Sequence, residues 1–326
     1  MLVLGGTGFM GPWVVRALVA DGHEVSVFHR GTTEVELPVS VRHVHGSFEA
    51  MPTAALRALE PEVVVDMTPF VRADSRRLMM FKGIARRGVA ISSADVYRAF
   101  GRLWRSEPGQ PDPLPLHEDS PLRTVVIDET YDKLGVEEEL RRRCELPVTI
   151  IRAPPTHGPR DDQHRLYRYV RRMADGRPAI LLDRALHGWR WARGYVEDVA
   201  HAIALAVVRE DAAGRTYNVA DAIAHTEADW VRAVGAVFGW HGEVIGVPTK
   251  RLPAAMRADK FDLRQHFVID SSRIRTELGY TESLPPEEAL RRTIDWELAN
   301  PPASPDDAFD YEAEEAVLTR LRSDAP

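Results

Sequence analysis

The sequence predicts an α/β protein in which a doubly wound parallel sheet is joined to a smaller C-terminal cap domain. Three observations predict this class. Short apolar runs alternate with segments of helical period, a glycine-rich turn follows the first apolar run, and proline and glycine pairs punctuate the chain after residue 152. Alternation of strands and helices gives a parallel sheet that helices cover on both faces.

The amino-terminal segment is typical of one strand, one helix and a second strand. The apolar run 2–4 leads into the turn 5–11, helical spacing follows over 12–20, and a strand is expected at 24–28. Because glycine has no Cβ, the backbone N–H groups of such a turn can approach a pyrophosphate, and the next helix offers its positive end. An ordinary tight turn is the alternative. We expect a dinucleotide to be bound here by Gly5, Thr7, Gly8, Phe9, Met10 and Gly11.

Further alternation extends the sheet. Right-handed crossovers place a ligand at the carboxyl ends of parallel strands. The proline-rich, acidic segment 105–123 has no clear period, and we expect it to be a long surface loop over that edge. Strands are expected at 41–44, 63–66, 89–92 and 148–151, and helices at 53–59 and 72–86.

The chain divides into two domains and a tail. We expect 1–154 to form the dinucleotide-binding domain, with 194–220 returning to it, and 155–302 to form the substrate-binding cap. Substrate is expected between the two domains. The acidic remainder 303–326 forms either a peripheral helix over 311–321 or a solvated tail.

Composition and charge limit the classes of function. With 326 residues, 44% of them hydrophobic, the chain can bury a full core. Its net charge of −7 supplies no basic field, so no nucleic acid partner is expected. Cys144 is the only cysteine, which excludes a disulfide framework and a thiolate cluster; we expect no metal site and a cytoplasmic location. No run approaches the ~20 apolar residues of a membrane span, so no membrane association is expected.

More motifs follow the glycine turn. The run 92–97 (SSADVY) follows the fifth strand, and the runs 133–137 (KLGVE), 195–200 (YVEDVA) and 277–280 (ELGY) come later in the chain. Together they resemble the extended short-chain dehydrogenase/reductase superfamily and its NAD(P)-dependent epimerase/dehydratase family, over roughly residues 1 to 300. The resemblance implies a Rossmann-type fold and hydride transfer at a hydroxyl or keto group of a sugar or nucleotide sugar.

The resemblance assigns two polar residues after the fifth strand. Ser93 matches the family position whose hydroxyl hydrogen-bonds the reacting oxygen, and Asp95 falls where related dehydratases carry an acid used in proton transfer. A serine that caps a strand end and a surface aspartate in a turn are the alternatives.

The catalytic pair of the family is altered in this chain. The family places a lysine four residues after a tyrosine, so that both lie on one helix face and the ammonium lowers the pKa of the phenol. Here Lys133 matches the ribose-binding lysine, and the displaced acid/base is either Tyr131 or Glu129. Tyr131 and Lys133 stand ~200° apart on an ideal helix, so they cooperate only if the helix begins late or is distorted. A structural tyrosine and a degenerate site are the alternatives.

The end of the second strand indicates which cofactor binds. A carboxylate there would accept hydrogen bonds from the adenosine ribose, but this chain has His29 and Arg30. A guanidinium can hold a 2′-phosphate, so we favour NADP, with NAD as the alternative. The resemblance places further residues against the cofactor: Ser47, Phe48, Met67, Thr68, Pro69, Lys133 and Pro154.

The cap weakens the assignment of a substrate. Where nucleotide-sugar enzymes often have an asparagine and a tyrosine, this chain has Pro155 and His157. Basic residues make the cap suitable for a diphosphate. The expected substrate contacts are Ser93, His157, His164, Arg165, Arg190 and Arg193.

Three functions remain open from the sequence. An NAD(P)-dependent epimerase or dehydratase would convert a nucleotide sugar, a biosynthetic NADPH-dependent ketoreductase would consume cofactor, and a non-catalytic dinucleotide sensor or scaffold would bind without turnover. The family resemblance also suggests a homodimer formed through 72–86 and 131–144.

Overall fold

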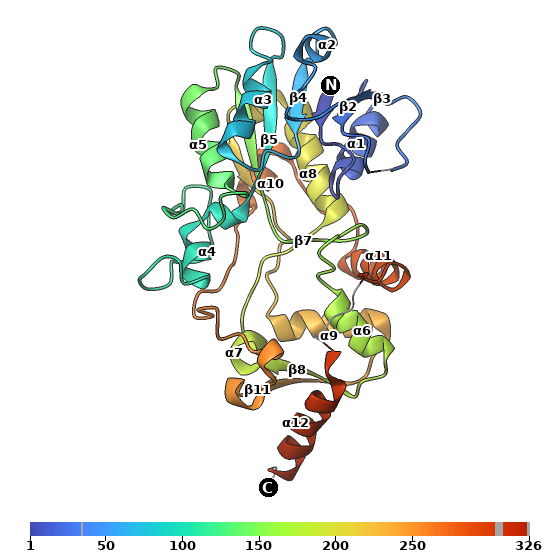
Figure 1. The fold of residues 1–326 in the computed structure, drawn as a ribbon, viewed down its shortest axis with the longest axis vertical. Coiled ribbons are helices and arrows are strands. Elements are labelled where there is room, and N and C mark those ends of the chain that lie inside the picture. Colours follow the sequence, from blue (N-terminus) through green and yellow to red (C-terminus); the bar gives the residue numbers. More distant parts are fainter. Residues whose placement is uncertain (34, 304–308, 325–326) are drawn as a thin grey trace.

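A seven-stranded parallel sheet forms the centre of the protein (Figure 1). The computed structural model describes residues 1–33, 35–303 and 309–324. The strand order β10-β6-β5-β4-β1-β2-β3 reverses direction between β1 and β4, and the carboxyl ends of those strands are where doubly wound folds bind ligands. The predicted fold class is confirmed. The strands are β1 Leu2–Leu4, β2 Ser26–His29, β3 Arg42–His45, β4 Val63–Asp66, β5 Arg87–Ser93, β6 Val148–Ala153 and β10 Thr216–Asn218.

Both faces of the sheet are covered because its strands are apolar on both sides. Val3 packs into one core cluster, whereas its neighbours Leu2 and Leu4 pack into another. Helices α1 (Gly11–Ala20), α8 (Val196–Val208) and α10 (Ser272–Leu278) contribute to the first cluster. The second is covered by α2 (Thr53–Arg57), α3 (Arg76–Met79) and α5 (Lys133–Arg143).

The helix expected over 72–86 is much shorter in the structure. A 3₁₀ turn, Arg72–Ser75, is followed by the single-turn helix α3, and Gly83 has a φ of +77°. The Asp74 carboxylate accepts hydrogen bonds from the backbone N–H groups of Phe70 and Val71, which caps the start of this segment, whereas the left-handed Gly83 is incompatible with a helix that continues to residue 86. The homodimer proposed through this segment stays a prediction.

Helix α5 begins later than the motif suggested. Asp132 is its N-cap, and the Asp132 side chain accepts a hydrogen bond from Gly135 N at 2.9 Å. Tyr131 therefore lies before the helix. The ~200° separation from Lys133, which assumed that both residues lie on one ideal helix, does not apply.

The cap elements gather at the end of the molecule opposite the sheet (Figure 1). Helices α6 (Tyr167–Ala174), α9 (Glu227–Phe238) and α11 (Pro286–Ala299) pack around Val170, Val231 and other buried residues. Two parallel pairs complete this part: β8 (Ala179–Asp183) with β11 (Glu243–Val247), and β7 (Thr156–His157) with β9 (Gly194–Tyr195). The remaining α-helices of the described chain are α4 (Arg98–Leu103), α7 (Arg184–His187) and α12 (Tyr311–Ser323).

Segments outside 1–154 also reach the sheet. The segment 194–220 carries α8 and β10, and β10 pairs with β6 in parallel register. Of the acidic C-terminal segment, α12 packs Val317 and Leu318 against the cap, so these residues form a docked helix. Residues 304–308 and 325–326 of that segment lie outside the described residues.

The segment 105–123 is a loop, as expected, but much of it is packed. Leu116 and Glu118 are buried, and the Glu118 carboxylate accepts a hydrogen bond from Asn218 N at 2.9 Å. The expectation of a surface loop is therefore only partly correct. In the described ranges, we find no helix long and apolar enough to cross a membrane.

A buried ion pair joins β6 to α5. Arg152 donates to Glu137 through Nη2 at 2.8 Å and Nε at 3.1 Å, and both side chains are only 1% exposed. Ser92, at the end of β5, donates to the same carboxylate. Arg152 Nη1 also donates to the Tyr97 hydroxyl at 2.9 Å and to the Glu118 carbonyl at 2.8 Å. This network holds three elements of the sheet domain in one arrangement.

Replacing Glu137 should destabilise the fold strongly. Glu137→Gln leaves Arg152 buried without an opposite charge, which costs about 3–5 kcal/mol of unfolding free energy. Burial raises the pKa of Glu137, but Arg152 beside it outweighs burial, so the pKa lies below its ordinary value. The contribution of the charge is therefore full above the unfolded-state pKa of about 4.3 and is lost as pH falls through the lower folded-state value. Urea denaturation at a series of pH values measures both effects.

Glu62→Gln serves as the control. Glu62 pairs with Arg86 on the surface, where both side chains are 63% exposed, so its loss should leave the denaturation midpoint nearly unchanged. Equal midpoints for the two variants would mean that the buried pair does not stabilise the fold.

Candidate active site

The glycine turn is shaped by close contacts at two positions and is open at a third. A Cβ at Gly5, whose φ is +81°, would lie 2.8 Å from the side chain of Thr68, and one at Gly11 would lie 2.6 Å from the backbone of Gly6. At Gly8 the nearest atom would be 3.9 Å away. The turn therefore packs tightly on its inner side and leaves its backbone accessible beside the start of α1, as a pyrophosphate site requires.

A cavity of about 620 Å³ opens between this turn and the end of β2. Arg160, from the segment after β7, lines it opposite Thr7. The buried Nε of Arg160 has no hydrogen-bond partner among the described residues. An unpaired guanidinium nitrogen beside an accessible glycine turn fits an anionic dinucleotide. The other lining residues are His29, Gly31, Thr33, Val35, Glu36, His43 and His45.

The residues predicted at the adenosine end lie in different surroundings. His29 lines the cavity and is buried; burial, followed by repulsion from His45 and His43, lowers its pKa. Arg30 is exposed, and it lies outside the lining of the cavity. Ser47 is also exposed and hydrogen-bonds Glu49.

The other predicted cofactor residues are largely packed. Phe48 contacts Phe28 edge to face at 5.1 Å. Met67 and Pro69 are buried just after β4, and Thr68 between them contacts the glycine turn. Pro154 is buried just after β6. Phe9 and Met10 pack beside Tyr195, at the start of α8.

Ser93, Asp95 and Tyr131 come together at the end of β5. The Ser93 side chain lies near enough to the Tyr131 phenol to oppose the rise of its pKa, and Asp95 N donates to Ser93 Oγ at 3.2 Å. Glu129 is exposed in the turn before Tyr131, and no recorded interaction links it to Ser93. Of the two candidate acid/base residues, Tyr131 is therefore the one that the structure brings to Ser93.

The surroundings of these groups favour their neutral forms. Burial, followed by the negative charge of Asp95, raises the pKa of Tyr131 above its ordinary value. Burial also raises the pKa of Asp95, against the opposing charge of Arg123, whose Nη2 lies 3.7 Å from Asp95 Oδ1. That Oδ1 atom is buried and has no hydrogen-bond partner in the described ranges.

Lys133 lies beneath this group. Its Nζ donates to the Ile91 carbonyl at 2.9 Å and lies 5.5 Å from the centre of the Tyr131 ring and 4.7 Å from that of Phe70. Burial lowers the pKa of Lys133 to about 8, although Asp66 and Asp95 oppose that shift. The ammonium faces the ring of Tyr131, so this pair differs from the usual tyrosine–lysine arrangement.

Asp66 is a buried acid that the sequence reasoning missed. It ends β4, accepts a hydrogen bond from Thr68 N at 3.0 Å and lies 3.7 Å from Arg77. Burial raises its pKa to about 6, and its Oδ2 has no hydrogen-bond partner among the residues described. The signal was an aspartate that directly ends the apolar run 63–65.

The predicted substrate residues separate into two groups. Of the predicted substrate residues, Ser93 and Arg165 interact with Tyr131. The positive charge of Arg165 opposes the rise in the pKa of Tyr131. His157 is buried, bonds Thr293 Oγ1 at 3.1 Å and has its pKa lowered to about 3 by burial. It is a packed core histidine in this structure.

The other three have partners of their own in the cap. His164 pairs with Glu297 at 2.7 Å, Arg193 pairs with the buried Glu227, and the exposed Arg190 donates to the Ala224 carbonyl. The structure does not bring them to Ser93.

The chain matches the model of the NAD dependent epimerase/dehydratase family over residues 1–73 and 85–220. It belongs to this family. The match confirms the predicted family, and with it an NAD(P)-dependent enzyme whose cofactor is a nicotinamide dinucleotide.

Similar proteins agree with this assignment. The dTDP-glucose 4,6-dehydratase of Neisseria meningitidis serogroup B is 22% identical, over 92% of this chain and 93% of the relative. That of Salmonella typhimurium is 29% identical over 162 residues, which are 49% of this chain and 43% of the relative, so this match spans less than half of that relative.

Solved structures show the same fold. The UDP-glucose 4-epimerase of Thermus thermophilus, in complex with NAD, has a TM-score of 0.65 and 23% identity, and the alignment covers 90% of this chain and 97% of that one. The UDP-glucose 4-epimerase of Thermotoga maritima, solved with UDP-glucose, has a TM-score of 0.65 and 19% identity, covering 91% and 98%.

Proposed function

We propose that this protein is an NADP-dependent dehydratase of a nucleotide sugar. The observation that carries the proposal is the group of Ser93, Tyr131 and Asp95, in which two proton-carrying side chains lie beside one serine hydroxyl. The named relatives act on nucleotide sugars, and the fold and glycine turn are those of their family.

The cofactor is assigned to the cavity beside the glycine turn. The backbone of 5–11 and the Arg160 guanidinium would hold the pyrophosphate, and Lys133 would lie toward the nicotinamide end. When bound, the nicotinamide accepts and returns a hydride. We favour NADP because no carboxylate ends β2 and because Arg30, which follows β2, has no hydrogen-bonded acidic partner among the described residues and interacts with Glu49 through charge alone.

Tyr131 and Ser93 are assigned to the hydroxyl that is oxidised. The phenol and the Ser93 hydroxyl lie near each other at the end of β5, and a substrate oxygen would bind between them. Ser93 would orient the oxygen, and the Tyr131 oxygen would exchange its proton. Because burial and Asp95 hold the phenol neutral, cofactor or substrate binding must lower its pKa before it can act as a base.

Asp95 favours dehydration over epimerisation. Dehydration transfers a proton from the carbon next to the new carbonyl to the hydroxyl that leaves as water. It therefore requires a second proton carrier, besides Tyr131, that would accept the first proton and donate one to the leaving hydroxyl. Asp95 is buried, its Oδ1 has no hydrogen-bond partner among the described residues, and burial raises its pKa, which favours a group that can carry a proton. Arg165, on the cap side of Tyr131, would contact the anionic part of a nucleotide sugar.

Tyr131→Phe should abolish turnover while the cofactor still binds. Loss of the proton carrier is expected to lower kcat by about 10²–10⁴-fold with dTDP-glucose or UDP-glucose as test substrates, because the phenol proton is exchanged in the reaction. Glu129→Gln, which tests the alternative acid/base, should keep wild-type kcat. The reverse result would assign the role to Glu129, and cofactor binding without turnover by the wild type would favour a sensor.

Asp95→Asn should separate the two halves of the reaction. Hydride transfer, followed by the absorbance of reduced nicotinamide on mixing with substrate, should persist, whereas the product lacking one water should no longer form in mass spectra. A wild-type product of unchanged mass and inverted configuration would identify an epimerase. Net oxidation of NADPH would identify a ketoreductase.

Two arginine variants test the choice of cofactor. Calorimetry should show tighter binding of NADP⁺ than of NAD⁺ to the wild type. Arg30→Gln should weaken NADP⁺ binding alone, by about 10-fold or more, because its guanidinium would reach only the 2′-phosphate. Arg160→Gln should weaken both cofactors alike. Tighter NAD⁺ binding by the wild type, or equal losses in Arg30→Gln, would contradict the assignment of NADP.

A further inference from the structure

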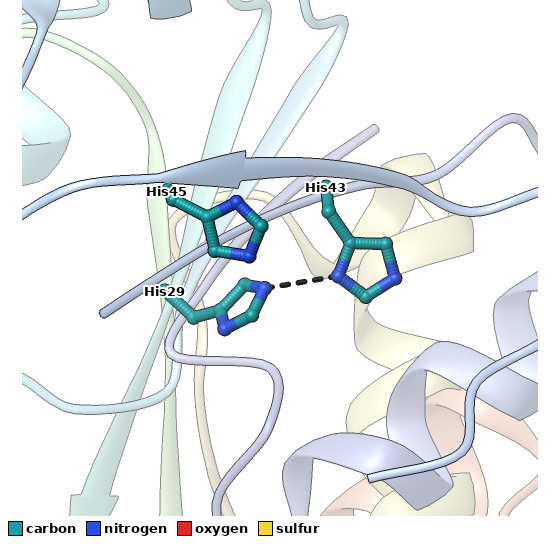
Figure 2. A group of neighbouring side chains, drawn as sticks. All are labelled: His29, His43 and His45. Carbon is teal, nitrogen blue, oxygen red and sulfur yellow. Dashed lines mark hydrogen bonds between the residues drawn. The ribbon is translucent and has the colours of Figure 1, made fainter. Parts of the chain in front are cut away.

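Three histidines converge at the edge of the sheet (Figure 2). His29 ends β2, and His43 and His45 lie on the edge strand β3. Side chains alternate along a strand, so His43 and His45 point to the same side, and the parallel register sets His29 directly opposite His45. The three histidines therefore lie on one face of the sheet because of the strand alternation and the register of β2 with β3.

The spacing of the rings suits a metal ion. One nitrogen of each imidazole lies within 4.8 Å of the other two, and His29 Nε2 lies 2.9 Å from His43 Nδ1. A tetrahedral ion with bonds of about 2.0–2.1 Å to nitrogen places its ligand nitrogens roughly 3.4 Å apart. To reach that geometry the side chains must rotate so that the His29 and His43 nitrogens move apart from 2.9 Å, and the hydrogen bond between these two rings is lost.

We propose that His29, His43 and His45 bind a divalent transition-metal ion such as Zn²⁺. Imidazole is the ligand type that such ions share, and the absence of thiolates from the group distinguishes it from a structural zinc cluster. Three protein ligands leave a fourth position open. Since the same three histidines line the 620 Å³ cavity, that open position faces solvent and exchangeable ligands.

Metal binding must replace interactions that the three imidazole rings make in the metal-free protein. The rings contact one another, with centroids 4.5 Å apart for His29 and His45 and 5.1 Å for His29 and His43. Gly31 N donates to His29 Nδ1 at 3.3 Å. An ion on Nε2 moves the imidazole proton to Nδ1, so this long contact must open. Gly31 is exposed, which leaves room for that adjustment.

The site was not predicted from the sequence, which considered only thiolate ligands. The alternation His43-Val44-His45 is visible in the chain, but the placement of His29 against it depends on the pairing of β2 with β3. The proposal does not depend on the catalytic role of Ser93 or Tyr131, so it can fail while the proposed function holds.

The test is a Zn²⁺ titration of the full chain without a polyhistidine tag, stripped of metal by a chelator and free of cofactor. Calorimetry should give one Zn²⁺ per chain. His43→Ala and His45→Ala should each weaken binding by more than the 10–100-fold that loss of an outer-sphere partner costs. Both residues are exposed on an edge strand, so these variants should fold even if His29→Ala does not.

His241→Ala is the matched control, since His241 is exposed in the turn before β11 and should leave Zn²⁺ affinity unchanged. In the Co²⁺ form, X-ray absorption should show nitrogen ligands from imidazole, and these should be reduced in the two variants. No stoichiometric binding by the wild type, or equal affinity in His43→Ala and the control, would overturn the proposal. So would a loss of NADP⁺ affinity in metal-free His43→Ala when the wild type binds no Zn²⁺, because the histidines would then be a phosphate site.

Discussion

The buried pair of Arg152 and Glu137 determines where the candidate catalytic residues lie. Moving two charges out of water is costly, and only the complete network of Ser92, Tyr97 and the Glu118 carbonyl around them offsets that cost. A shift of α5 would break the network and leave a charge alone. The first turn of α5 is therefore held against β5 and β6, and Lys133 and Tyr131 are positioned by the same contacts.

The late start of α5 changes the chemistry that the familiar motif would support. Asp132 caps the helix, so Tyr131 lies in the preceding chain, where its hydroxyl reaches Ser93. Lys133 Nζ donates to the Ile91 carbonyl and lies 5.5 Å from the centre of the phenol ring. Burial and the charge of Asp95 raise the pKa of Tyr131, and burial raises the pKa of Asp95. Two acids with raised pKa values beside one serine distinguish this site from a tyrosine–lysine pair.

The sheet could be predicted from the sequence because its strands are apolar runs, and the turn after β1 could be predicted because the glycines of 5–11 determine it locally. The helix expected over 72–86 was too long because its helical period continues past Met79, whereas the chain leaves the helix there and Gly83 adopts a left-handed conformation. Ser93 and Lys133 were found through motifs. Asp66 was missed as a site residue because its importance comes from burial, which spacing along the chain does not contain. Arg160 could be identified only as one of several basic residues of the cap, because its place beside the glycine turn depends on a contact between distant segments.

One short loop of the cap reaches both ends of the candidate site. Arg160 and His164 have φ values of +76° and +47°, a conformation that costs a non-glycine residue roughly 1–2 kcal/mol each. The loop is held there by the pairs His164–Glu297 and Arg165–Asp161. It thereby directs Arg160 into the cofactor cavity and Arg165 toward Tyr131. The contact of His164 with Glu297 of α11 offsets part of this strain, so one strained loop places both guanidinium groups.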